Sequence, residues 1–141
     1  MNLKKTYKIT PYNWYLNVIV TNDFSASVEK YNKGLQFIGI ETCGGFFTSH
    51  TNQPHEGWIF IKPDSELSTI SHESFHATVK LMSDIGAELE SSSEESYAYL
   101  LGHIVNLVLD TADLYLKKAD KLKASLNQDP DNKDGNVNII I

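Results

Sequence analysis

The apolar residues of this 141-residue chain change their spacing once, close to Pro63, and that change constrains the fold more than any other feature. Before Pro63, apolar and β-branched residues stand in short runs, which are typical of β-strands. After it, apolar residues recur every three or four positions, as they do on one face of an α-helix. A chain of this length forms one domain, so we predict an α+β fold in which an antiparallel or mixed sheet packs on two helices.

The first half of the chain contains four runs that we interpret as strands. They cover residues 14–21, 35–41, 46–48 and 57–61. Between the first two runs, Phe24, Val28 and Tyr31 are spaced four and three residues apart. This spacing predicts a short helix, which Gly34 brings to an end.

The first of the two longer helices is predicted by Phe75, Val79 and Met82, which stand at positions i, i+4 and i+7. It covers about residues 68–84 and stops at Gly86, because glycine readily adopts the backbone conformation that ends a helix.

The second long helix is predicted to start after the serines at 91–93, which are N-cap candidates, and to run to about residue 123, with a break allowed near Asp110. Its apolar positions include Tyr97, Leu101, Ile104, Val108 and Tyr115. Beyond it the composition is dominated by Asp, Asn, Lys and Gly. We therefore predict one domain over residues 1–124 and a disordered tail over residues 125–141.

Composition excludes several functional classes. The chain has 12 Lys, no Arg and 18 acidic residues, for a net charge of −6, so we expect no nucleic-acid partner. Cys43 is the only cysteine, and no apolar run is long enough for a signal peptide or a membrane span. These features predict a cytoplasmic protein that does not bind membranes. They do not predict its oligomeric state.

One sequence motif indicates metal binding and catalysis. Residues His72-Glu73-Ser74-Phe75-His76 form an HExxH sequence inside the first long helix. Histidines four residues apart leave a helix on the same face, so both imidazoles can bind one tetrahedral Zn²⁺. Glu73 can then take a proton from a zinc-activated water as that water attacks a carbonyl. The alternative to a metal site is an ordinary solvent-exposed helix face that carries two histidines and a glutamate.

The context of the motif resembles a known family. A second helix follows, and it contains Ser92-Ser93-Glu94-Glu95-Ser96-Tyr97-Ala98-Tyr99-Leu100-Leu101-Gly102. A helical HExxH with a glutamate about 20 residues later is similar to the gluzincin branch of the zincin metallopeptidases, and especially to its minimal domains. The resemblance implies His72 and His76 as zinc ligands, Glu73 as general base and Glu95 as the third ligand. Glu94 is the rival for that third position.

The chain also departs from related patterns. Val79 and Met82 stand where the metzincin extension needs Gly and His, so that branch is rejected. Tyr99 stands where the thermolysin-like pattern has an aspartate that orients a histidine ligand. Tyr97, Tyr99 and His103 are candidates to stabilise an oxyanion, and each has an alternative role in packing or as an ordinary helix residue.

These observations predict a zinc-dependent metallopeptidase whose substrate is a peptide or protein. The strand around Trp58–Ile61 is a candidate to bind substrate backbone by strand addition, or else an ordinary core strand. Two alternatives remain: a non-catalytic zinc-binding interaction module of zincin-like fold, and a chance motif in a metal-free accessory protein.

Overall fold

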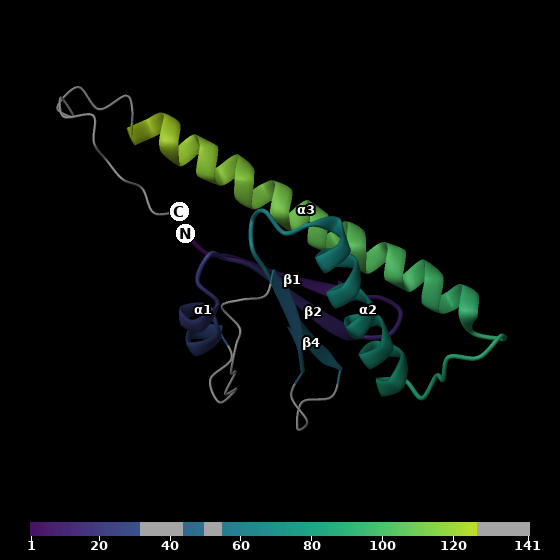
Figure 1. Ribbon diagram of the computed structural model, residues 1–141. Helices are drawn as coiled ribbons and strands as arrows, with labels where there is room; N and C mark the ends of the chain where they lie inside the picture. Colours follow the sequence, from purple (N-terminus) through teal and green to yellow (C-terminus); the bar gives the residue numbers. More distant parts are fainter. Residues whose placement is uncertain (32–43, 50–54, 127–141) are drawn as a thin grey trace.

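A computed structural model describes residues 1–31, 44–49 and 55–126 of the chain (Figure 1). Its elements follow the order β1, β2, α1, β3, β4, α2, α3. The strands are β1 (Leu3–Ile9), β2 (Trp14–Val20), β3 (Gly45–Thr48) and β4 (Glu56–Ile61). The helices are α1 (Phe24–Tyr31), α2 (Leu67–Asp84) and α3 (Glu94–Leu126). The α+β class is confirmed, with strands in the first half and the two long helices in the second.

The four strands form one mixed sheet in the order β1-β2-β4-β3. β1 and β2 are antiparallel, β2 and β4 are parallel, and β3 is antiparallel to β4. Three of the predicted strands are confirmed as β2, β3 and β4, while the predicted strand over 35–41 lies outside the described residues. β1 was not predicted, because lysines break up its apolar residues. It lies at a sheet edge, where such side chains remain in water.

The helices cover both faces of the sheet (Figure 1). α2 and α3 pack on one face, where alternate residues of β2 meet the apolar sides of both helices in the larger core. α1 packs on the other face, where Phe24 and Val28 join Ile19, Trp58 and Phe60 in a smaller cluster. The motif helix α2 therefore packs against the sheet and, along its side, against α3. Its remaining side is left in solvent.

The predicted ends of the first long helix are close to those observed. α2 ends at Asp84, and Gly86 follows with a φ of 75°, a conformation that glycine adopts without strain. The second helix is longer than predicted, since α3 begins at Glu94, reaches Leu126 and has no break at Asp110. Asp110 is exposed, so its side chain needs no internal partner and the helix continues past it.

The side chain of Asp84 connects the last turn of α2 to the sheet through hydrogen bonds. Its carboxylate accepts hydrogen bonds from the indole Nε1 of Trp14 at 2.8 Å and from the backbone N–H of His55 at 3.2 Å. Lys80 donates to it from one turn earlier in the helix. Burial alone would raise the pKa of Asp84, but these hydrogen bonds and the charge of Lys80 outweigh it and hold the pKa below its ordinary value.

Because its pKa is lowered on folding, Asp84 stabilises the protein above the ordinary carboxyl pKa of 3.8, and this contribution is lost as the pH falls through the folded value. We expect Asp84→Asn to lower the free energy of unfolding at pH 7 by about 1–3 kcal/mol. Urea unfolding should show this difference shrinking below pH 3.8. Asp113→Asn is the control, because Asp113 forms only an exposed ion pair with Lys117. An equal loss in both variants would contradict this role.

No helix in the described part of the chain is long and apolar enough to cross a membrane. The compartment predicted from the sequence stays a prediction.

Candidate functional site

The two histidines of the motif lie side by side on the exposed face of α2. The Nε2 atoms of His72 and His76 are 3.1 Å apart, and the two rings meet edge to face at 4.7 Å between centroids. Both side chains are exposed, because the opposite face of the helix packs into the core. The helical spacing therefore brings two nitrogen atoms to one point in solvent, as the sequence predicted.

Glu73 is the unusual member of the motif. It is only 8% exposed, yet its carboxylate forms no hydrogen bond or ion pair with any residue in the described part of the chain. A carboxylate that no described residue engages, on a side chain packed at the edge of a cavity, marks a candidate functional group. Together with His72 it lines an open cavity of about 310 Å³.

The opposite wall of this cavity comes from the beginning of β3. Gly44 and Gly45 face Ser68 and Thr69 on the first turn of α2. A Cβ atom on Gly45 would lie 2.9 Å from the carbonyl oxygen of Phe60 and 3.1 Å from the Cγ2 of Thr69. Glycine is therefore what allows β3 to approach both β4 and α2 closely. In the sequence, a pair of glycines indicates only a turn or bulge, and Thr69 gives no signal of its place beside them.

The strand beside this cavity is not the one that the sequence suggested. β4, which contains Trp58–Ile61, pairs with β2 on one side and with β3 on the other, so its backbone is occupied on both edges. Its role as an ordinary core strand is confirmed. In the described sheet, β3 is the edge strand on this side.

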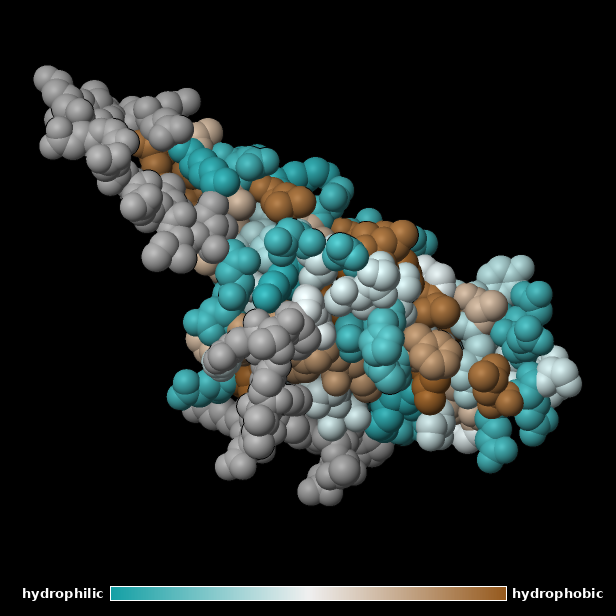
Figure 2. Space-filling view, viewed as in Figure 1, coloured by the Kyte–Doolittle hydropathy of each residue, from teal (hydrophilic) through white to brown (hydrophobic). Residues whose placement is uncertain are grey.

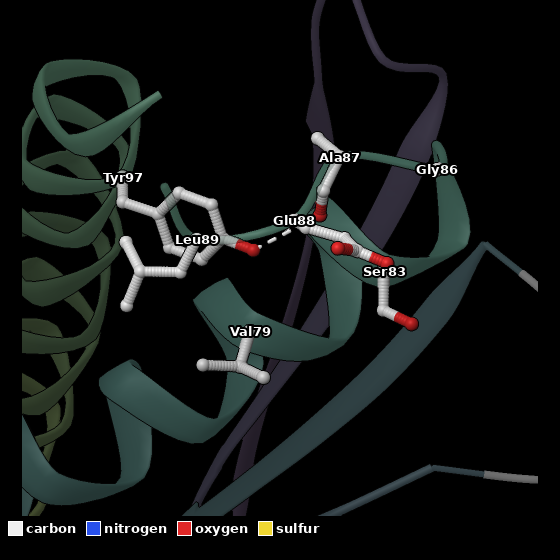
Figure 3. A pocket seen from close by; sticks show the side chains of 7 residues that line it. All are labelled: Val79, Ser83, Gly86, Ala87, Glu88, Leu89 and Tyr97. Atoms are coloured by element: carbon white, nitrogen blue, oxygen red, sulfur yellow. Dashed lines mark hydrogen bonds between the residues drawn. The ribbon is translucent and has the colours of Figure 1, made fainter. Parts of the chain in front are cut away.

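A second cavity, of about 370 Å³, lies at the far end of α2 (Figure 3). Val79 and Ser83 of α2 form one wall, Tyr97 of α3 another, and the connecting segment from Gly86 to Leu89 closes it. Val79 stands one turn after His76 on the same exposed side of the helix. The histidine pair and this largely apolar hollow therefore lie on the same exposed side of α2.

Glu95 and Glu94 lie in the first turn of α3, and both are exposed. That turn lies near the C-terminal end of α2, since Tyr97 shares a cavity with Val79 and Ser83. His72 lies in the first half of α2 and His76 just past its middle, about 12 Å along the axis from the last residue of the helix. The structure therefore does not bring Glu95 or Glu94 into a ligand group with the histidines.

The three oxyanion candidates are also dispersed. The hydroxyl of Tyr97 donates to the carbonyl oxygen of Ala87 at 3.0 Å, and the side chain is buried, which is a packing role. Tyr99 is 78% exposed and His103 is exposed. At 100° per residue, both lie outside the buried stripe of α3. We include none of the three in the mechanism proposed below.

A scan against protein-family models and searches of curated proteins and of solved structures found no match to this chain. Within residues 1–31, 44–49 and 55–126, no group of three or more His, Cys, Asp or Glu side chains is placed to hold a metal ion. The assignment to the gluzincin branch of the zincins is therefore wrong. α3 starts beside the C-terminal end of α2, and the exposed glutamates of its first turn form no ligand group with the histidines among the described residues.

Proposed function

We propose that the chain is a zinc-dependent hydrolase that cleaves peptide bonds, with His72 and His76 binding the metal and Glu73 acting as general base. The observation that carries this proposal is the pair of imidazole nitrogen atoms 3.1 Å apart. Glu73 stands between the two histidines in the sequence, and its carboxylate has no partner among the described residues. No relationship to a known family enters the argument.

The geometry of the pair fits a shared zinc ion. Two nitrogen ligands at 2.0–2.1 Å in tetrahedral coordination are separated by about 3.3 Å, and the two Nε2 atoms are 3.1 Å apart. The same distance also suits a hydrogen bond between two neutral imidazoles, so the metal itself has to be measured. The described residues supply two ligands, and further positions are left for water, substrate or another side chain.

His72, Glu73 and His76 then each have a role in the proposed reaction. Zinc supplies Lewis acidity, which polarises a carbonyl and lowers the pKa of a bound water. The carboxylate of Glu73 accepts the proton of the attacking water and passes it to the leaving amine. Its burial beside His72 keeps it at the site and limits competing contacts with solvent.

Two features support an extended peptide as the substrate. In the described sheet, the outer edge of β3 lies beside the cavity of Glu73 and pairs with no other described strand, so a peptide can pair with it by strand addition. The apolar hollow next to Val79 can accept an apolar side chain a few residues away along the same helix. The substrate we propose is therefore a peptide or protein segment with an apolar residue close to the cleaved bond.

We expect about one zinc ion per chain in protein purified without chelator, and loss of that zinc in both His72→Ala and His76→Ala. Elemental analysis by mass spectrometry measures it. His103→Ala is the matched control, because it removes an exposed helical histidine from the other helix. A wild-type protein that holds no zinc after zinc is offered contradicts the proposal. Glu95→Ala belongs in the same series: zinc loss would make Glu95 the third ligand, and retention would exclude it.

A second candidate is zinc binding without catalysis, in an interaction module. It is favoured by the exposure of the histidine pair and by the missing third ligand among the described residues. A partner protein would then complete the coordination. The Glu73 variant described in the Discussion separates the two functions.

A further inference from the structure

α3 carries two apolar stripes, and the fold buries only one of them. The buried stripe consists of Tyr97, Leu100, Ile104, Val108, Thr111, Tyr115 and Ala119. The second stripe lies beside it and consists of Ala98, Leu101, Val105, Leu109, Ala112 and Leu116. Its members are partly or fully exposed, with Leu109 at 38% and Leu116 at 45%. Figure 2 shows apolar side chains exposed at several places along this helix.

The spacing of the second stripe is that of a packed helix face. Its residues follow each other at intervals of 3, 4, 4, 3 and 4, which average the 3.6 residues of one helical turn. A stripe of this kind is normally buried against another element. Within the described residues, only Val105 and Ala112 of this stripe pack at the edge of the larger core.

Gly102 is an independent sign of a missing neighbour. It stands inside the 33-residue helix, where glycine is the poorest residue after proline. A Cβ atom at this position would meet nothing within 4 Å, so packing within the chain does not require glycine there. Glycine does allow another helix to approach closely, and Gly102 borders the second stripe.

We propose that two copies of this chain pair through the second stripe, with their α3 helices antiparallel about a two-fold axis between Val105 and Leu109. This register sets Ala98 opposite Leu116 of the other copy, and Gly102 opposite Ala112. A small residue of one helix then faces either a large or another small residue of the other helix, which allows close packing. Each contact occurs twice, as two-fold symmetry requires.

The charges of α3 favour the antiparallel orientation. Its first turn contains Glu94 and Glu95, and its last turn contains Lys123. An antiparallel pair brings the acidic end of each helix to the basic end of the other, and the two helix dipoles also oppose each other. A parallel pair would place like charges together at both ends.

The size of the stripe sets the strength of the pairing. Its 18-residue span measures about 27 Å and is one helix face wide, which is small for a stable interface. We therefore expect a dimer that dissociates in the micromolar range. Sedimentation equilibrium from about 1 to about 100 μM covers that range, and it should show a mass that rises from 15.9 kDa toward twice that value.

Three variants test the surface. Leu109→Lys should weaken association at least about tenfold, because it would bury a charge at the centre of the pair. Gly102→Ala should stabilise the monomer against urea and yet weaken the dimer. His103→Lys, on the side of α3 opposite the second stripe, should leave the dimer unchanged. A wild type that stays monomeric at about 100 μM, or a dimer unaffected by Leu109→Lys, overturns the proposal.

Disulfide cross-linking tests the orientation. With Cys43 replaced by serine, Ala98→Cys combined with Leu116→Cys should form an intermolecular disulfide on mild oxidation. Leu116→Cys alone should not, because its two copies would lie about 27 Å apart in an antiparallel pair. Efficient cross-linking of Leu116→Cys alone would indicate a parallel pair and overturn the orientation.

Discussion

Glu73→Gln is expected to lower the rate of peptide hydrolysis by about 10²- to 10⁴-fold while the protein keeps its zinc. The amide has nearly the same shape as the carboxylate but cannot accept the proton of the attacking water. Since Glu73 forms no hydrogen bond or ion pair within the described residues, its replacement breaks no structural contact. The stability should therefore change by less than about 1 kcal/mol.

The measurement combines mass spectrometry of a peptide mixture after digestion with elemental analysis of the same samples. Glu66→Gln is the matched control, because Glu66 is an exposed glutamate directly before α2. Full hydrolysis by zinc-loaded Glu73→Gln would exclude Glu73 as the base. A wild type that binds zinc and cleaves none of the peptides would favour the interaction module instead.

Trp14→Ala is expected to have the largest effect on stability, with a loss of about 3–5 kcal/mol in the free energy of unfolding. Trp14 is 0% exposed and is among the largest fully buried side chains of the described core. Its ring packs directly over Gly57, where an added Cβ atom would clash with it. The substitution leaves a cavity and also removes the hydrogen bond from the indole to Asp84.

Urea unfolding followed by far-ultraviolet circular dichroism measures this loss, which is a large part of the total stability of an ordinary domain. Trp14→Phe separates the two contributions, because it keeps most of the ring volume and loses only the hydrogen bond, for about 1–3 kcal/mol. A loss below about 1 kcal/mol in Trp14→Ala would contradict the packing described for β2 and α2.

The sequence predicted local elements well wherever one periodic pattern determined them. β2 and β4 are apolar runs that are buried on both faces, and α2 follows its three-and-four spacing to a glycine with positive φ. It missed β1, in which Leu3 and Ile9 are buried but are separated by lysines. It also allowed a break near Asp110, because a charged residue in an apolar pattern does not reveal that its side chain points into solvent.

The histidine pair could be predicted for the same reason, since positions four apart share a helix face in any α-helix. The third ligand could not. Whether Glu95 reaches His72 and His76 depends on where α3 starts relative to α2, and the connecting residues place that start near the wrong end of α2. Tyr99 and His103 stay predictions, because a helical spacing gives a shared face but not the direction in which that face points.

The sequence by itself therefore determined the fold class, the helix that carries the motif and the proximity of the two imidazoles, because each of these depends on residues close together along the chain. Only the tertiary structure decided that the Glu73 side chain is mostly buried and that β3 rather than β4 lies at the edge of the described sheet. It also decided that no third ligand joins the two histidines among the described residues. These features depend on the packing of segments that are distant in sequence, and neither spacing nor composition encodes that packing locally.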